Sequence, residues 1–257
     1  MLNLTDQIKQ EIIEEGLKAY PKECCGFLLD IGGAYKLYPV PNDAGDWGED
    51  FFIMDASHWV EAELAGDEVI AIYHTHPVSS SIPSAPDKEA CKRSGVPWVV
   101  CSPKQSDFSV IYPDDIEPNT DILGRSFVWG MWDCYGLVKD IYKRALNIEL
   151  PDIDRGKLFG WEDDPAWNVI ENNLKYAGFF PLDRRKPLQK YDVFLMVINS
   201  PFNKVNHCGV LIEPDKSIFY HHLMGRLSEA AVYGGWFQQV TTKVVRHKDI
   251  DIQAEIT

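Results

Sequence analysis

The segment HTHPVSSSIPSAPD, which runs from His74 to Asp87, carries three potential metal ligands. Residues i and i+2 at the end of a strand project from the same face, so His74 and His76 can hold one ion through their imidazoles. Asp87, in the first turn of the helix that we expect to follow, can supply a third ligand. Three protein ligands leave a fourth position for water, which is typical of a catalytic zinc site.

Two further residues suit the chemistry of such an ion. A water activated by zinc needs a base, and Glu23 in PKECCGFLL is a carboxylate with apolar neighbours. Ser84 can donate a hydrogen bond to the oxyanion that develops on a scissile carbonyl. A plainer interpretation also stays open, because SAPD is a typical helix start with Ser84 as N-cap and Asp87 as its capping-box partner.

Together these positions resemble the JAMM metalloprotease family, also called MPN or JAB, whose pattern is an upstream Glu followed by H-x-H-P, six residues and S-x-x-D. Glu23 stands in the P-x-E-x-C-G context of that pattern. The positions that fit without an insertion are His74, His76, Pro77, Ser84 and Asp87. The resemblance implies an α/β fold of the JAMM (MPN/JAB, cytidine-deaminase-like) type, Zn²⁺ as cofactor, and cleavage of a peptide or isopeptide bond.

The second half of the chain carries a candidate nucleophile in WDCYGLVKDIYKRAL. Cys134 begins an apolar helical stripe directly after Asp133, a suitable N-cap, so we expect Cys134 in the first turn of a helix. A helix N-terminus and a nearby imidazole both stabilise a thiolate, the nucleophilic form of cysteine. The imidazole that we expect is His207, at the start of the strand HCGVLI.

A third polar group has to fix the tautomer of His207. If EPDKS closes a hairpin directly, Ile212 pairs with Ile218. Gly209 then pairs with His221, and this places His221 beside His207 because alternate residues of a strand share a face.

Several neighbouring residues have alternative interpretations. His222 is the alternative to His221 as the orienting residue. Cys208 adjoins the expected base and faces the other way, so we expect it in the core. A lone Cys134 on an apolar stripe would by default be a buried core cysteine. The sequence DCYGLV and the order of the histidines along the chain favour the nucleophile.

WDCYGLV and HCGVLI resemble the NlpC-type family of papain-like murein endopeptidases, in which D-C-x-G-L-V starts the helix of the nucleophile and H-x-G marks the base. Tyr135 replaces the Ser usual in bacterial members, and LQKYDV lacks the glycine usually found before the Asp192 position. The resemblance covers about Phe127 to His247. It implies an α+β papain-like fold, with peptide stems of peptidoglycan as substrate.

The elements that must position these residues differ between the two halves. An amphipathic N-terminal helix precedes strands expected at 25–30, 35–40, 69–74, 97–102 and 108–113, with a short helix from Pro86 to Gly95. This alternation indicates an α/β domain. The second half begins with helices starting at Cys134 and at Asp164, the latter ending at Gly178, and continues with strands expected at 192–198, 207–212 and 218–222. Helices followed by antiparallel strands indicate an α+β domain.

The stretch from Pro113 to Ser126 is acidic, contains proline and has no periodicity, which is typical of a linker. We therefore predict a JAMM-like domain at 1–115, a linker at 116–126 and an NlpC-type domain at 127–257.

The composition narrows the classes of partner. A net charge of −14 disfavours nucleic-acid binding, which needs clustered Lys and Arg. No apolar stretch reaches the length of a membrane span, and the N-terminus lacks the basic start and apolar run of a signal peptide. We therefore expect synthesis in a cytoplasm and six cysteines that stay thiols.

The order of the two domains, together with FVWGMWDCYGLVKDIY and FYHHLMGRLS, resembles the tail assembly protein K family of lambda-like bacteriophages. This resemblance implies tail-tip proteins as partners, a location in the host cytoplasm during assembly and in the virion tail, and a cysteine domain that cuts peptidoglycan. Two other hypotheses stay open: a structural or chaperone-like assembly factor in which one or both sites are vestigial, and a ubiquitin-like deconjugase, which rests on the first domain alone.

Overall fold

The computed structural model describes residues 2–117, 119–155, 168–183, 185–200 and 203–250. The chain divides into two compact units, Met1–Asn119 and Thr120–Thr257. Each unit has its own sheet and its own apolar core, which confirms the expected two-domain architecture. No helix in the described ranges combines the length and apolarity needed to cross a membrane.

The limits predicted for the linker, 116–126, stay a prediction. The end of this stretch is attached to the second unit by backbone hydrogen bonds. Gly124 N donates to Ser228 O at 2.8 Å, and Arg125 N donates to Ser228 Oγ at 2.9 Å.

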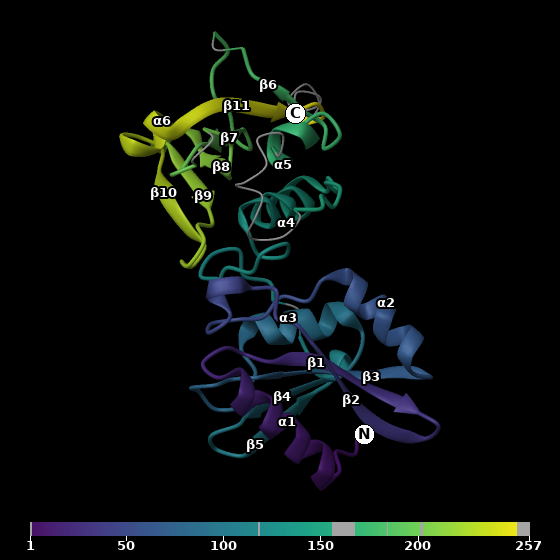
Figure 1. Ribbon diagram of the computed structural model, residues 1–257. Coiled ribbons are helices and arrows are strands. Elements are labelled where there is room, and N and C mark those ends of the chain that lie inside the picture. The colour runs from purple at the N-terminus through teal and green to yellow at the C-terminus, as the bar shows by residue number, and fades with distance from the viewer. Residues whose placement is uncertain (1, 118, 156–167, 184, 201–202, 251–257) are drawn as a thin grey trace. The chain divides into compact units, whose positions relative to one another are not determined.

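Within the described residues, the first unit contains a five-stranded mixed sheet in the order β2-β1-β3-β4-β5 (Figure 1). Its strands are β1 (Cys25–Ile31), β2 (Ala34–Val40), β3 (Glu68–Thr75), β4 (Trp98–Ser102) and β5 (Asp107–Ile111). Only β3 and β4 pair in parallel. The helices are α1 (Asp6–Ala19), α2 (Ala56–Ala65) and α3 (Ala85–Ser94). These strands match the predicted positions to within a few residues.

Helices cover both faces of this sheet, as Figure 1 shows. On one face, Ile8 and Ile12 of α1 pack against Leu28 and Tyr73. On the other face, Ala62 of α2 and Cys91 of α3 pack in the core that contains Phe27, Leu29 and Trp98. Burial on two faces explains why β1, β3 and β4 are apolar nearly throughout and show little alternation. The prediction of an α/β domain is confirmed.

Helix α2 was not predicted. Its sequence, ASHWVEAELA, has a weak apolar stripe, and Ala62 is its one fully buried residue. Asp55 starts the helix by accepting a hydrogen bond from Ser57 N at 2.8 Å. Helix α3, in contrast, ends as predicted at Gly95, which takes the left-handed conformation with φ of 73°.

In the described part of the second unit, a six-stranded antiparallel sheet has the order β10-β9-β8-β7-β11-β6. Its strands are β6 (Phe179–Pro181), β7 (Val193–Met196), β8 (His207–Glu213), β9 (Ile218–His221), β10 (Glu229–Val232) and β11 (Thr241–His247). The helices are α4 (Cys134–Leu146), α5 (Val169–Asn173) and α6 (Trp236–Val240). The prediction of an α+β domain is confirmed.

The alternation of β7 and β8 divides the core of this unit. Leu195, Cys208 and Val210 face the buried stripe of α4, where Leu137 and Val138 lie. The intervening side chains form a second apolar cluster on the opposite face of the sheet: Phe194, Met196, Leu211 and Phe219. The two-residue period therefore decides which residues of β8 lie near the start of α4.

Two sequence expectations need comment. Asp164 and Pro165, the expected start of the second helix, lie outside the described residues. The predicted pairing of Ile212 with Ile218 is wrong: the register shifts between Leu211 and Glu213, so Glu213 pairs with Ile218. A bulge at the hairpin end absorbs the extra residue.

A buried ion pair joins β11 to the start of β7. Arg246 Nε lies 2.7 Å from Asp192 Oδ1, and Arg246 Nη2 lies 2.8 Å from Asp192 Oδ2. Both side chains are buried. This bidentate pair compensates two charges that would be costly to bury separately.

We expect Arg246→Met to destabilise the second unit by about 3–5 kcal/mol, because Asp192 would be buried without a counter-charge. The matched control on the same strand is Lys243→Met, which removes a half-exposed ion pair with Glu171 and should cost at most about 1 kcal/mol. Urea unfolding measures both free energies. Equal losses of unfolding free energy in the two variants would contradict the role of Arg246 as the buried counter-charge of Asp192.

Candidate active sites

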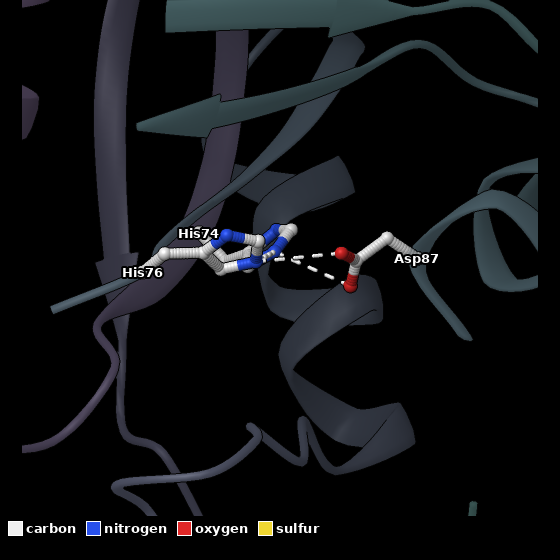
Figure 2. Close-up of side chains that lie close together, drawn as sticks. All are labelled: His74, His76 and Asp87. Atoms are coloured by element: carbon white, nitrogen blue, oxygen red, sulfur yellow. Dashed lines mark hydrogen bonds and ion pairs between the residues drawn. The ribbon is translucent and has the colours of Figure 1, made fainter. Parts of the chain in front are cut away.

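The imidazoles of His74 and His76 converge with the carboxylate of Asp87 (Figure 2). His74 Nε2 lies 3.2 Å from His76 Nε2 and 3.3 Å from Asp87 Oδ1, and His76 Nε2 lies 3.4 Å from Asp87 Oδ2. All three residues are buried. His74 lies in strand β3, and His76 lies just beyond the end of that strand. Asp87 lies in the first turn of α3.

The spacing of these atoms fits a tetrahedral ion. Zinc–nitrogen bonds of about 2.0–2.1 Å give neighbouring ligand atoms a separation of about 3.3 Å at tetrahedral angles. Three electron-rich atoms at this spacing repel one another unless a proton or a metal cation lies between them. The donor set and its geometry therefore fit the zinc ion that the sequence predicts.

The backbone prepares His76 for this role. Its Nδ1 lies 2.8 Å from the carbonyl oxygen of Ser80, so Nδ1 carries the proton and Nε2 presents a lone pair to the cluster. Burial alone would lower the pKa of His76, but hydrogen bonds to Asp87 and to Ser80 O raise it above its ordinary value. Burial also opposes ionisation of Asp87, yet hydrogen bonds from His74 and His76 hold the pKa of its carboxyl well below the usual range.

Glu23 lies near this cluster, two residues before β1 begins. Its backbone is held by a hydrogen bond from Glu23 N to Gly48 O at 2.7 Å and by one from Asn42 Nδ2 to Glu23 O at 3.1 Å. Burial raises the pKa of its carboxyl to about 8, an effect that His76 opposes and Asp87 reinforces. The pairing of Cys25 with His74 explains this proximity, because it places the segment that carries Glu23 beside the end of β3.

Ser84 forms the capping box that the plainer interpretation predicts. Ser84 Oγ accepts from Asp87 N at 3.2 Å, and Asp87 Oδ2 accepts from Ser84 N at 2.7 Å. Because Oγ acts here as an acceptor, its hydroxyl proton is still available for donation, and the side chain is exposed. The role of Ser84 as an oxyanion donor stays a prediction.

The second cluster forms where the start of α4 meets β8. Cys134 is the first residue of α4 and is 8% exposed. Hydrogen bonds with Cys208 and with His207, together with the charge of His207, outweigh burial and hold the pKa of the Cys134 thiol well below its ordinary value. Thiolate character is what nucleophilic chemistry requires of this residue.

Behind His207 lies His221, in the register that the sequence analysis proposes. Gly209 pairs with His221, and His207 Nε2 lies 3.3 Å from His221 Nδ1. Burial and the neighbouring His207 lower the pKa of His221 to about 3, so His221 is neutral near pH 7. A neutral imidazole can hold the tautomer of His207 without competing for its charge. The orienting role of His221 stays a prediction.

His222 occupies a different environment from His221. Its Nε2 lies 3.1 Å from Arg226 O, and its ring packs edge-on against Phe127. It lines the same cavity as Cys134 and His207. His222 therefore lines the cavity, whereas His221 lies next to His207, the expected base.

The expectation that Cys208 faces the other way from His207 and lies in the core is confirmed, but the consequence for the second site was missed. Cys208 does point to the opposite face of β8 from His207, as the strand period requires, and it is buried in the core. That face, however, is the one on which α4 lies, so Cys208 belongs to the same apolar cluster as Cys134, and the two thiols affect each other's pKa. Predicting this proximity requires two pieces of information: the alternation of side chains along β8 and the face of the sheet on which α4 lies.

Asp133 fixes the start of α4. Its Oδ1 accepts from Gly136 N at 2.7 Å, and its Oδ2 accepts from Gly130 N at 2.9 Å and lies 2.6 Å from Arg155 Nε. A Cβ at Gly136 would collide with the carbonyl oxygen of Met131, which explains the glycine two residues after the cysteine. Sequence reasoning identified the cap but missed Arg155.

A cavity of about 430 Å³ opens beside the thiol. Its walls are mainly apolar and include Trp129, Tyr135, Ile153 and Leu174. Tyr135, which departs from the NlpC-type pattern, donates from its hydroxyl to Pro151 O at 3.0 Å. The departure therefore affects the wall of the cavity and leaves the position of the thiol unchanged.

Comparisons with known proteins assign both domains. Residues 5–112 match the prokaryotic homologs of the JAB domain, and residues 124–246 match the NlpC/P60 family. Tail tip assembly protein K of Escherichia phage N15 is 33% identical over 239 residues, which are 93% of this chain and 93% of that protein. The chain belongs to the tail tip assembly protein K family.

Other members and relatives agree with this assignment. Tail tip assembly protein K of Escherichia phage lambda is 29% identical and covers 76% of this chain and 89% of its own length. Desampylase of Haloferax volcanii is 34% identical over 94 residues, which are 32% of this chain and 64% of that protein. The predicted family and its two peptidase-type domains are confirmed, and so is the class of phage tail proteins.

We expect Cys134 to be alkylated by iodoacetamide at about pH 6.5, where an ordinary thiol with a pKa of about 8.5 is only about 1% ionised. Because its pKa is held well below the ordinary value, Cys134 should be more ionised at that pH than an ordinary thiol, whereas burial raises the pKa of Cys24 and Cys91 to about 11. Peptide mass mapping identifies the labelled residue. His207→Ala should slow labelling about tenfold or more, and the matched control His58→Ala in the other unit should not. Equal labelling of all six cysteines would refute the assignment.

Proposed function

We propose that the second domain of this tail tip protein is a Cys–His endopeptidase that cleaves peptide stems of murein. The single observation that carries this proposal is the meeting of Cys134, His207 and His221 where α4 begins on the sheet. The apolar cavity beside the thiol offers room for a peptide. Acidic groups are few on the described walls, so neutral or anionic portions of a stem peptide are the more compatible ligands.

The residues of this site suffice for acyl transfer. The Cys134 sulfur attacks the scissile carbonyl carbon and forms a thioester, while His207 gives a proton to the leaving amine nitrogen. His207 then takes a proton from water, whose oxygen attacks the thioester carbon and releases the free carboxylate and Cys134. His221 holds His207 in the required tautomer throughout.

For the first domain we propose a zinc metallopeptidase that cleaves a peptide or isopeptide bond, with His74, His76 and Asp87 as ligands. When bound, zinc supplies the Lewis acidity that makes water nucleophilic at neutral pH. Glu23 would accept a proton and return it to the leaving amine, and the Ser84 hydroxyl would donate to the developing oxyanion. The similarity of this domain to a desampylase supports the same class of chemistry.

Membership of the tail tip assembly family supports tail-tip proteins as partners. We propose that the protein works in the host cytoplasm during assembly and reaches the cell wall with the virion tail. This route would deliver a murein peptidase without any need for secretion. A purely structural assembly factor is less well supported, because both sets of reactive residues are complete and gathered.

We expect purified protein to release muropeptides from sacculi, and Cys134→Ser to reduce the rate on the order of 10³-fold or more, since an alcohol at this position lacks the ionised nucleophile. Mass spectrometry of the products measures the rate and identifies the bond. The matched control Cys91→Ala removes a buried thiol of the first domain and should retain activity. A chelator should leave these products unchanged. Undiminished digestion by Cys134→Ser would exclude the proposed nucleophile.

We expect the protein to bind about one zinc ion per chain, and His74→Ala/His76→Ala to lose it, because a single carboxylate does not hold the ion. Elemental analysis after dialysis measures the ratio. His58→Ala, which changes a histidine of the same domain outside the cluster, should retain the metal. Retention of zinc by the double variant would place the ion elsewhere.

A further inference from the structure

Cys208 is a second thiol within the active site, on the core side of the sheet. Strand β8 turns His207 toward one face and Cys208 toward the other, where it joins Leu195 and Val210 under α4. Cys134 starts α4 and belongs to the same apolar cluster. Both residues line the same cavity, and each thiol shifts the pKa of the other.

This thiol pair differs from Cys24, Cys25 and Cys91, whose sulfurs contact oxygen atoms. Cys25 and Cys91 interact with backbone carbonyl oxygens at 3.5–3.8 Å, and Cys24 interacts with Thr75 Oγ1 at 3.5 Å. None of these contacts places a second sulfur against the first. In the second unit, by contrast, Cys134 and Cys208 belong to one apolar cluster and both line the wall of a cavity that small solutes can enter.

We propose that Cys134 and Cys208 are a reversible oxidation site, at which peroxide converts the two thiols into a disulfide. This inference rests on the proposed function, because it assigns a regulatory modification to the same nucleophile. Oxidation would withdraw the Cys134 sulfur from catalysis, and reduction by a small thiol would restore it. Cys208 then acts as the resolving cysteine, and its position next to the reactive sulfur protects that sulfur from irreversible oxidation.

The chemistry balances with hydrogen peroxide as the only oxidant. The Cys134 thiolate attacks one peroxide oxygen, the O–O bond breaks, and one water leaves, which gives a sulfenic acid. The Cys208 sulfur then attacks the Cys134 sulfur, the S–O bond breaks, and the second water leaves with the thiol proton. Two thiols lose two electrons and two protons, and one peroxide becomes two waters. Dithiothreitol reverses the reaction by thiol–disulfide exchange.

The test treats the reduced full-length chain with a slight excess of hydrogen peroxide and then blocks the remaining thiols. After proteolysis, mass spectrometry should find a peptide pair that joins Cys134 to Cys208 and is two hydrogens lighter than the reduced peptides. Dithiothreitol should separate the pair and restore muropeptide release in the wild type.

In Cys208→Ser, Cys134 should instead progress to sulfinic and sulfonic acids, and less than about one-tenth of the activity should return after dithiothreitol. Circular dichroism of this variant, and a second variant, Cys208→Ala, show whether the domain is folded. The matched control Cys91→Ala should still form the Cys134–Cys208 pair.

Sulfinic acid on Cys134 of the wild type with Cys208 still free would overturn the proposal, and so would a disulfide from Cys134 to any other cysteine. The cross-link needs no substrate, so its outcome is independent of hydrolysis. A chain that forms the disulfide but never digests sacculi would refute the peptidase and leave the oxidation site standing. A chain that digests sacculi but never forms the disulfide would refute the oxidation site and leave the peptidase standing.

Discussion

The carboxylate of Asp133 holds the end of α4 at which the second site is built. It is 1% exposed and bonds two backbone amides and one guanidinium, so most of its capacity as an acceptor is used. Burial raises the pKa of this carboxyl, and the Arg155 charge opposes that rise. The position of the Cys134 thiol relative to the histidines of β8 and β9 depends on this cap, because Cys134 is the first residue of the capped helix. The helix start is therefore the anchor of the catalytic geometry.

In both domains the reactive residues lie where the N-terminus of a helix meets the end of a strand. In the first, α3 brings Asp87 to the histidines that β3 presents. In the second, α4 brings Cys134 to the histidine that begins β8. In each case the strand end carries the imidazoles, and the helix carries the group that works with them: the carboxylate of Asp87 in the first domain and the thiol of Cys134 in the second. Two unrelated folds thus solve the same positioning problem with the same pair of elements.

Much of this arrangement follows from local sequence. The ligands His74 and His76 follow from the period of a strand, and the place of Cys134 follows from Asp133 as a cap. The proximity of Cys208 to Cys134 was missed, because it depends on which face of β8 the helix covers, and that is a property of tertiary packing. Strand β10 has mostly exposed residues and helix α2 has a weak apolar stripe, so neither leaves a clear periodic signal. The hairpin register failed at one position because a bulge inserts a residue that alternation alone does not reveal.

Asp87 has two roles. Its carboxylate completes the capping box at the start of α3, and it also contacts the imidazoles of His74 and His76. Natural selection for folding alone would therefore preserve this aspartate, even in a phage whose first domain had ceased to cleave anything. The histidines have structural contacts of another kind: the ring of His74 packs against Phe52 and Trp98, and Nδ1 of His76 bonds to Ser80 O, but neither side chain caps a helix. A related phage protein that kept Asp87 but lost both histidines would therefore have kept the start of this helix and lost the metal ligands of its first domain.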